Sequence, residues 1–203
     1  MGKMNLLKGN WEGKVGETVG AKWKNKSTIR TYTKPANPNT AAQQSVRSVF
    51  AQMTSFVAMF ADQIKYLSAL NTAGQSVRNA IIQINKSMIA DGTFNKANLL
   101  ISKGGLQKVA GENAEAATKK VKVTWNNPTA TNFTADAKLI AVMVQAESGL
   151  VDVIEAPATE GTTGVTSGID FETGSVDVYV YFLDKRGSNK VASISDYLTV
   201  NIA

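Results

Sequence analysis

The sequence of 203 residues predicts an α+β protein with a basic N-terminal arm, a two-helix hairpin and a C-terminal immunoglobulin-like β-sandwich. Two observations carry this prediction. Apolar residues follow a helical period after a strong helix-start signal, and from Val121 the period changes to two, with turn signals every 8–12 residues. We place the arm at residues 1–34, the hairpin with its connector at 35–118, and the sandwich at 119–203.

The arm combines frequent glycines with large apolar residues. The glycines at positions 9, 13, 16 and 20 are too frequent for a helix, and the alternation after Trp11 is typical of short strands or of an extended arm with turns. Trp11 and Trp23 are expected to pack either on the protein's own helix or on a neighbouring subunit. The candidate interface residues are Trp11, Lys14, Val15, Val19, Trp23, Lys24, Arg30 and Arg47.

A long helix is expected to start at Thr40. Asn37-Pro38 is a turn signal, and Thr40 and Gln43 have the spacing of a capping box, in which each side chain accepts a hydrogen bond from the other residue's backbone amide. Apolar residues then recur at every third or fourth position as far as Leu67, which places them on one face of a helix. We therefore expect the helix to end near Asn71.

A second helix is expected from the same kind of signal. Thr72 and Gln75 repeat the capping-box spacing, the apolar period continues to Met88, and Asp91-Gly92 ends it. Beyond this helix, residues 99–101 are a candidate strand and residues 107–120 are a polar, alanine-rich connector.

The C-terminal part has the period of strands. We expect strands at residues 121–125, 138–145, 150–154, 175–183 and within 191–202, with a long loop at 156–168. Trp125 is expected in the core of the sandwich.

Charge is distributed unevenly along the chain. The net charge of +6 is the sum of +7 in residues 1–47, +4 in residues 48–120 and −5 in residues 121–203. The basic N-terminal segment of one copy can attract the acidic C-terminal segment of another copy, or it can bind phosphate. The third interpretation is that these charges are only solvated surface charges.

Residues for common active-site chemistry are missing. The chain has neither cysteine nor histidine, which removes the usual general base and the commonest metal ligands. The acidic residues lie at turns and strand ends and do not form the spaced pair of a glycosidase. We therefore expect no enzymatic activity, no catalytic residues, no metal and no cofactor. The start of the sequence lacks the apolar run of a signal peptide, and no stretch is long and apolar enough to span a membrane.

Several motifs resemble a family of uncharacterised proteins encoded by Bacteroidota and by phages that infect them. The matching segments are Gly13-Lys14-Val15-Gly16, Trp23-Lys24, Asn37-Pro38-Asn39-Thr40 with Ala42-Gln43, Ile101-Ser102-Lys103-Gly104-Gly105-Leu106, and Ser193-Ile194-Ser195-Asp196-Tyr197-Leu198. This chain has Asn39 where the family usually has arginine. The resemblance implies a phage context and favours a virion component over an enzyme.

The expected function is therefore that of a structural subunit of a bacteriophage particle, as one copy of a neck or tail ring or as a capsid-associated protein. Its partners would be copies of itself and other virion proteins, and its location the virion, after assembly in the host cytoplasm. We expect no membrane partner. One alternative is a surface- or carbohydrate-binding adhesion module, because sandwiches often present binding loops. A second is nucleic-acid binding through the basic arm.

Overall fold

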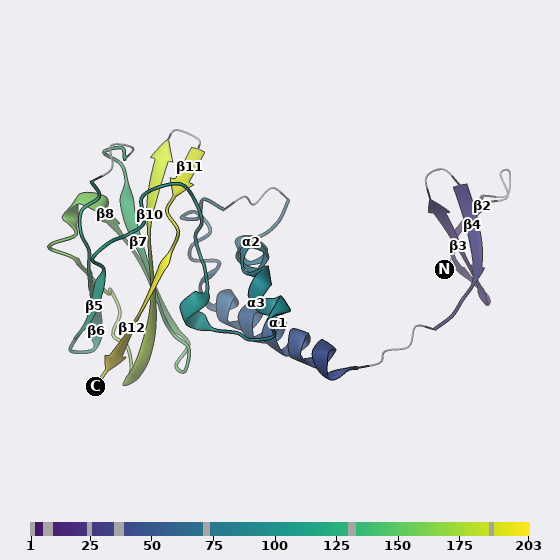
Figure 1. The fold of residues 1–203 in the computed structure, drawn as a ribbon, viewed down its shortest axis with the longest axis horizontal. Coiled ribbons are helices and arrows are strands. Elements are labelled where there is room, and N and C mark those ends of the chain that lie inside the picture. The colour runs from purple at the N-terminus through teal and green to yellow at the C-terminus, as the bar shows by residue number, and fades with distance from the viewer. Residues whose placement is uncertain are drawn as a thin grey trace. The chain divides into compact units, whose positions relative to one another are not determined.

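The protein contains helices and strands, and strands predominate (Figure 1). The structure, a computed structural model, describes residues 3–5, 10–23, 26–34, 39–70, 74–129, 133–186 and 189–203. The chain divides into two compact units, Met1–Thr40 and Ala41–Ala203, which are described separately. The prediction of a protein that mixes helices with antiparallel strands is confirmed.

The N-terminal unit is a four-stranded antiparallel sheet in which the strands follow one another in chain order. Gly16, with a φ of 59°, lies in the turn between the second and third strands, where a residue with a side chain would be strained. Of the two alternatives for the glycine-rich segment, the structure has the strands. They are β1 (Lys3–Asn5), β2 (Asn10–Val15), β3 (Thr18–Trp23) and β4 (Lys26–Thr31).

The C-terminal unit begins with helix α1, Ala41–Phe60, which starts directly after Thr40 as predicted. The expected end near Asn71 is wrong, because the α-helix stops at Phe60. Residues 61–67 continue as turns in which several amides bond three residues back, as between the Leu67 amide and the Ile64 carbonyl. This tighter winding still buries Ile64 and Leu67, so the apolar spacing predicted burial correctly but not the type of hydrogen bond.

The second helical segment is split at Asn85 into α2 (Val77–Ile84) and α3 (Lys86–Ala90). The buried Asn85 amide donates to the carbonyls of Ile81 and Leu100, and its oxygen accepts from the Leu100 amide. The side chain thus ties the helix break to the following segment. The predicted stop is confirmed, because α3 ends at Ala90 and Gly92 has a φ of 69°.

The predicted start of this segment is wrong. Ser76, rather than Thr72 with Gln75, caps α2, because the Ser76 hydroxyl accepts from the Asn79 amide at 3.3 Å. Thr72 itself lies outside the described residues.

Removing this cap gives a first testable prediction. Ser76→Ala should lower the free energy of unfolding by about 1 kcal/mol, because the Asn79 amide loses its acceptor. Ser76→Asp keeps an acceptor and should retain most of the stability. Urea unfolding of the two variants measures the difference, and equal stability of wild type and Ser76→Ala would contradict the cap.

Two antiparallel sheets make up the rest of the C-terminal unit. The five-stranded sheet has the order β11-β10-β7-β8, with β12 also paired to β10, and the three-stranded sheet has the order β5-β6-β9. The strands are β5 (Asn113–Ala117), β6 (Lys120–Thr124), β7 (Lys138–Gln145), β8 (Leu150–Pro157), β9 (Val165–Thr166), β10 (Gly174–Arg186), β11 (Asn189–Ala192) and β12 (Asp196–Ile202). Short 3₁₀ turns lie at η1 (Lys96–Asn98) and η2 (Ala158–Glu160).

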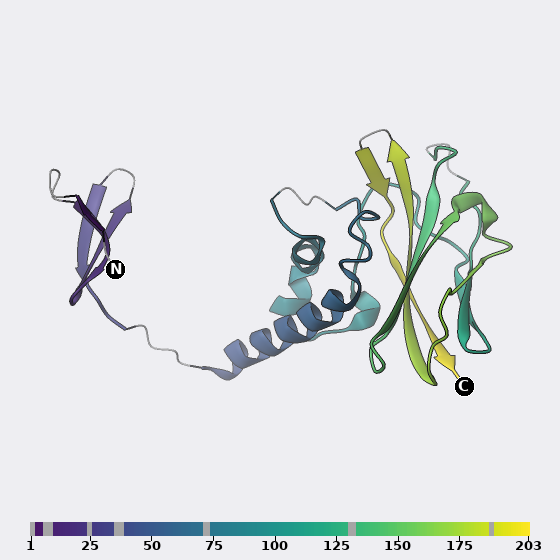
Figure 2. The same ribbon diagram turned by 180° about the vertical axis from the view of Figure 1, so that it is seen from behind.

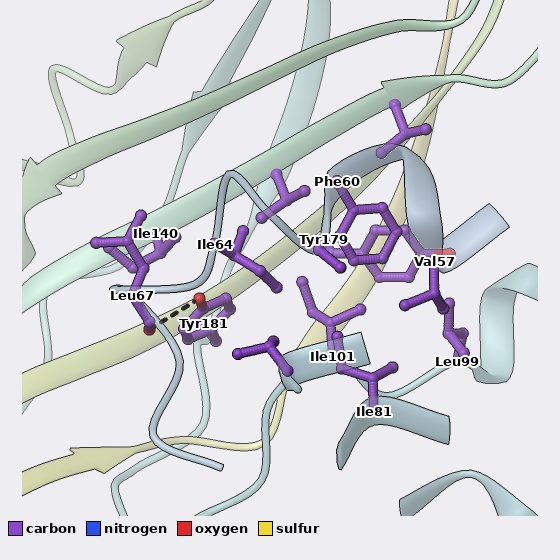
Figure 3. Close-up of a cluster of buried hydrophobic side chains, with 14 of the residues drawn as sticks. Val57, Phe60, Ile64, Leu67, Ile81, Leu99, Ile101, Ile140, Tyr179 and Tyr181 are labelled. Carbon is purple, nitrogen blue, oxygen red and sulfur yellow. Dashed lines mark hydrogen bonds between the residues drawn. The ribbon is translucent and has the colours of Figure 1, made fainter. Parts of the chain in front are cut away.

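Strand β10 shows how the five-stranded sheet is buried on both faces. Tyr179 and Tyr181 point to a cluster that includes Phe60 and Ile81 from the helices (Figure 3). The alternate residues of β10, such as Val178, join a second cluster with Val121 and Val123 from the three-stranded sheet. Two hydrophobic clusters therefore share one sheet.

Three predictions for this region need correction. Leu99 and Ile101 are buried, but residues 99–101 form no strand, because the side chains of Asn85 and Ser195 accept from the Leu100 and Ile101 amides. The expected connector at 107–120 contains β5, and the expected loop at 156–168 contains η2 and β9. Trp125 lies in the core as predicted, with 2% of its surface exposed.

Candidate assembly surface

One face of the N-terminal sheet carries a row of residues from three strands. In the register, Lys14 of β2 lies opposite Val19 of β3, and Val19 lies opposite Arg30 of β4. Residues paired directly across an antiparallel sheet share a face, so Lys14 and Arg30 flank Val19 on the same side. Both basic residues are exposed, and neither has a carboxylate partner among the described residues.

Tyr32 extends this row beyond the end of β4. The Lys14 ammonium lies 3.6 Å from the centre of the Tyr32 ring, a cation–π contact, and the Tyr32 amide donates to the Glu17 carbonyl at 2.6 Å. Together with Val19 and Arg30, these side chains line an open recess of about 440 Å³. We call Lys14, Val19, Arg30 and Tyr32 the basic row. It has the size and charge to receive an acidic side chain.

The opposite face of the same sheet is less charged. Gly20 pairs with Gly13 on one side and with Ile29 on the other, and the next row contains Val15. Ile29 is 58% exposed and Val15 is 49% exposed. The residues of this unit that the structure describes form a single layer, and among them no second layer covers either face, whereas stable domains pack at least two layers around a core.

The structure brings together only part of the predicted interface. Lys14, Val19 and Arg30 share the basic row, Val15 lies on the other face, and Arg47 is exposed on α1 in the other unit. Trp11 and Trp23 belong to β2 and β3, but their side chains lie outside the described part of the chain, as does Lys24.

Sequence reasoning left Tyr32 and Ile29 out of the predicted interface. The period of two that places Arg30 on one face also places Tyr32 there and Ile29 on the other, so a fixed register would have found both.

Several buried polar groups in the C-terminal unit have structural partners, although Thr54 Oγ1 and Asp196 Oδ2 are buried without a hydrogen bond among the described residues. Asp177 of β10, which is 3% exposed, accepts from the Lys96 ammonium at 2.8 Å and from the Tyr197 hydroxyl at 2.7 Å. Burial, followed by the hydrogen bond to Asp177, raises the pKa of Tyr197 to about 12. The Tyr181 hydroxyl donates to the Leu67 carbonyl at 3.1 Å (Figure 3). These bonds fix the turns after α1 and η1 to the sheet and leave no free catalytic group among them.

Asp184 near the end of β10 is a fully buried carboxylate. It accepts from the backbone amide and the hydroxyl of Thr134 and from Arg186 Nε at 3.0 Å. Burial alone would raise the pKa of Asp184, but the hydrogen bonds from Thr134 and Arg186 outweigh it, and the pKa lies below its ordinary value. A carboxyl group with a lowered pKa stabilises the folded state above its unfolded-state pKa and loses this effect as the pH falls through its folded-state pKa.

This linkage gives a second prediction. The wild type should lose stability on acidification from about pH 5 to pH 3, and Asp184→Asn should show a smaller loss over the same range. At neutral pH the variant should already be less stable, because the amide cannot replace both acceptor oxygens. Asp170→Asn, at an exposed position, is the control. If urea unfolding gave the same pH slope for wild type and Asp184→Asn, the prediction would be wrong.

Within the described ranges, no group of three or more acidic, histidine or cysteine residues is placed to hold a metal ion. None of the described helices combines the length and apolar character needed to cross a membrane.

Comparisons with known proteins give one strong match. A model for a family of unknown function, DUF6266, matches residues 9–199. No curated protein matches the chain. Among solved structures, a family 76 glycoside hydrolase from a bovine Bacteroides thetaiotaomicron strain is 14% identical with a TM-score of 0.36. That match covers 48% of this chain and 20% of the hydrolase, and at this TM-score it carries no argument. Because the family model spans nearly the whole chain, the protein belongs to the DUF6266 family.

Proposed function

We propose that the protein is a non-enzymatic structural subunit of a bacteriophage particle that acts by assembling with copies of itself. The single-layered N-terminal sheet is the observation that carries this proposal. A sheet with an exposed apolar face and an exposed basic face gains stability by packing against another surface. The phage context rests on the sequence resemblance, and a place in a neck or tail ring or on the capsid is part of the proposal.

We also propose that the two C-terminal sheets form an immunoglobulin-like sandwich, with α1 and α2 as a two-helix hairpin packed on it. In the lettering of immunoglobulin-like domains, β5, β6 and β9 correspond to strands A, B and E, so the three-stranded sheet has the order A-B-E. Strands β7, β8 and β10 correspond to C, C′ and F, and β11 and β12 together correspond to G. The other sheet has the order G-F-C-C′. These orders match those of immunoglobulin-like sandwiches.

The C-terminal unit has what it needs to fold alone. Among the residues whose side chains are described, its two hydrophobic clusters contain none before Met53, and both clusters draw on strands and helices of residues 41–203. The N-terminal unit, in contrast, carries eight basic and two acidic residues in its forty and a net charge of +6.

Deletion of residues 1–40 tests the proposal. We expect a soluble C-terminal unit that unfolds cooperatively and stays monomeric, whereas the full-length protein forms oligomers that light scattering and negative-stain microscopy detect. If the truncated protein formed the same oligomers, the N-terminal sheet would not drive assembly. A full-length protein that stayed monomeric at all concentrations would overturn the proposed function.

Nucleic-acid binding is the competing function with support from the basic row. Salt-dependent binding of single-stranded DNA by the full-length protein at near-physiological ionic strength, lost on deletion of residues 1–40, would favour it.

A further inference from the structure

Three carboxylates gather at one end of the C-terminal unit. Glu147 lies in the turn between β7 and β8, and Asp170 and Glu172 lie in the segment that precedes β10. The Gln145 side chain joins these two segments, because it donates to the Glu172 carbonyl at 2.8 Å and accepts from the Glu172 amide at 3.0 Å. All three carboxylates are exposed.

The strand register and the figures place this end near the last residues of β12. Gly174, at the start of β10, pairs with Ile202, and Gln145 at the end of β7 pairs with Leu150. Figures 1 and 2 show the β7–β8 turn, the start of β10 and the C-terminus at the same, lower end of this unit. A recess of about 350 Å³ opens there, lined by Asp170 and Glu172, by the apolar Leu150 and Ile202, and by one basic residue, Lys119, among others. We call Glu147, Asp170 and Glu172 the acidic end.

Most of the acidic end lacks basic partners. Glu147 and Glu172 have no ion pair among the described residues, and Asp170 has only a 4.0 Å contact with the Lys120 ammonium, between two well-exposed side chains. Such exposed pairs contribute little to stability. The acidic end therefore keeps its charge available for a partner.

We infer that the basic row of one copy binds the acidic end of a neighbouring copy. Each surface has a recess flanked by apolar and charged side chains, and the charges are opposite. The +6 of the N-terminal unit and the −5 of residues 121–203 extend this complementarity beyond the contact itself. Two copies of the basic row would repel each other, which argues against a symmetric contact between two basic rows.

This inference rests on the proposed function and specifies its contact. The two surfaces differ, so the contact is heterologous: each copy uses its basic row on one neighbour and its acidic end on the other. Heterologous contacts generate closed rings when the rotation between copies closes, and open filaments when it does not.

Charge reversal on each surface provides the test. The row variant is Lys14→Glu with Arg30→Glu, and the end variant is Glu147→Lys with Glu172→Lys. Each variant alone brings like charges together and should raise the protein concentration needed for assembly at least about tenfold. An equimolar mixture should assemble again, because the reversed row fits the reversed end and the native row fits the native end.

Two matched controls reverse charges away from the contact. Lys22→Glu lies on the opposite face of the same sheet, since its row alternates with that of Val19. Glu160→Lys lies in η2 beyond the end of β8 that is remote from Glu147. Both controls should assemble like the wild type. Neutral variants, Lys14→Gln with Arg30→Gln and Glu147→Gln with Glu172→Gln, repeat the test if a reversal impairs folding, and should each weaken assembly.

Sedimentation velocity over a range of concentrations and salt separates the outcomes. Assembly that is lost in each variant and restored in the mixture supports the inference. Variants that assemble normally, or folded variants whose mixture stays monomeric, would overturn it while leaving the proposed function in place. A monomeric wild type would overturn both, and so would an intramolecular contact, which is independent of concentration. DNA binding by the wild type that the row variant loses, without a change in assembly, would assign the basic row to nucleic acid instead.

Discussion

Gly104→Ala is expected to lower the free energy of unfolding by about 3 kcal/mol, because a side chain at this position has no room. A β-carbon there would overlap the carbonyl oxygen of Ala192 and lie 2.9 Å from its carbonyl carbon. Both are backbone atoms of the edge strand β11, so no flexible side chain can move aside. The same Ala192 carbonyl accepts from the Leu106 amide at 3.1 Å. The substitution should therefore detach the segment that follows η1 from β11.

The adjacent glycine is a matched control. A β-carbon at Gly105 would meet nothing within 4 Å, and neither glycine has a positive φ. Gly105→Ala should thus change stability by less than about 0.5 kcal/mol. Chemical denaturation of the two variants makes the comparison, and equal losses would show that close backbone approach is not the reason for glycine at position 104.

Trp125→Ala should cost about 3–5 kcal/mol, the range for removing a large aromatic side chain from a core. Trp125 is 2% exposed and belongs to the cluster between the two C-terminal sheets. Its indole Nε1 donates to the Ala158 carbonyl at 3.0 Å, and its own amide donates to the Gly161 carbonyl at 3.1 Å. The residue therefore holds η2 against the end of β6, in addition to filling the core.

A second substitution separates these two contributions. Trp125→Phe keeps most of the buried surface but leaves the Ala158 carbonyl without its donor, so we expect a smaller loss of about 1–3 kcal/mol. Thermal and urea unfolding give both values. If Trp125→Ala were less destabilising than Trp125→Phe, the assignment of Trp125 to the core would be wrong.

The elements predicted best from the sequence are those with the strongest burial. Strand β7, Lys138–Gln145, has the predicted boundaries, because a strand covered on both faces requires a continuous apolar run that few other structures share. The start of α1 follows its turn and capping signals in the same way. The end of α1 was not predicted, because residues 61–67 keep the apolar spacing of a helix while several of their amides bond to the carbonyl three residues back.

Elements that depend on distant partners could not be predicted. Strand β5 is alanine-rich and mostly exposed, so its sequence favours a helix or a connector, and its pairing with β6 makes it a strand. Residues 99–101 have the composition of a strand, but Asn85, at the break between α2 and α3, and Ser195, in the β11–β12 connection, accept from their backbone amides.

For the candidate assembly surface, the sequence identifies residues but not their arrangement. Lys14, Val19 and Arg30 stand out as basic or apolar residues in a glycine-rich segment, and the sequence offers no way to tell that they form one row. Their alignment follows from the register in which β2 and β3 pair, and the turn at Gly16 and Glu17 sets this register. Val15, predicted with them, is on the other face for the same reason.

The bonds between residues 101–106 and 192–195 also constrain how the protein folds during synthesis. The Ser102 hydroxyl donates to the Ser193 carbonyl and the Ile101 amide donates to the Ser195 hydroxyl, across more than ninety residues of sequence. A ribosome-bound chain can form α1 early, but this helix and the segment after η1 have no complete sheet to pack on until β10, β11 and β12 have emerged. Contacts of such long sequence separation slow folding. The C-terminal unit is thus expected to fold late and in one step, and ribosome-stalled chains that end before residue 189 should remain sensitive to protease throughout residues 41–186.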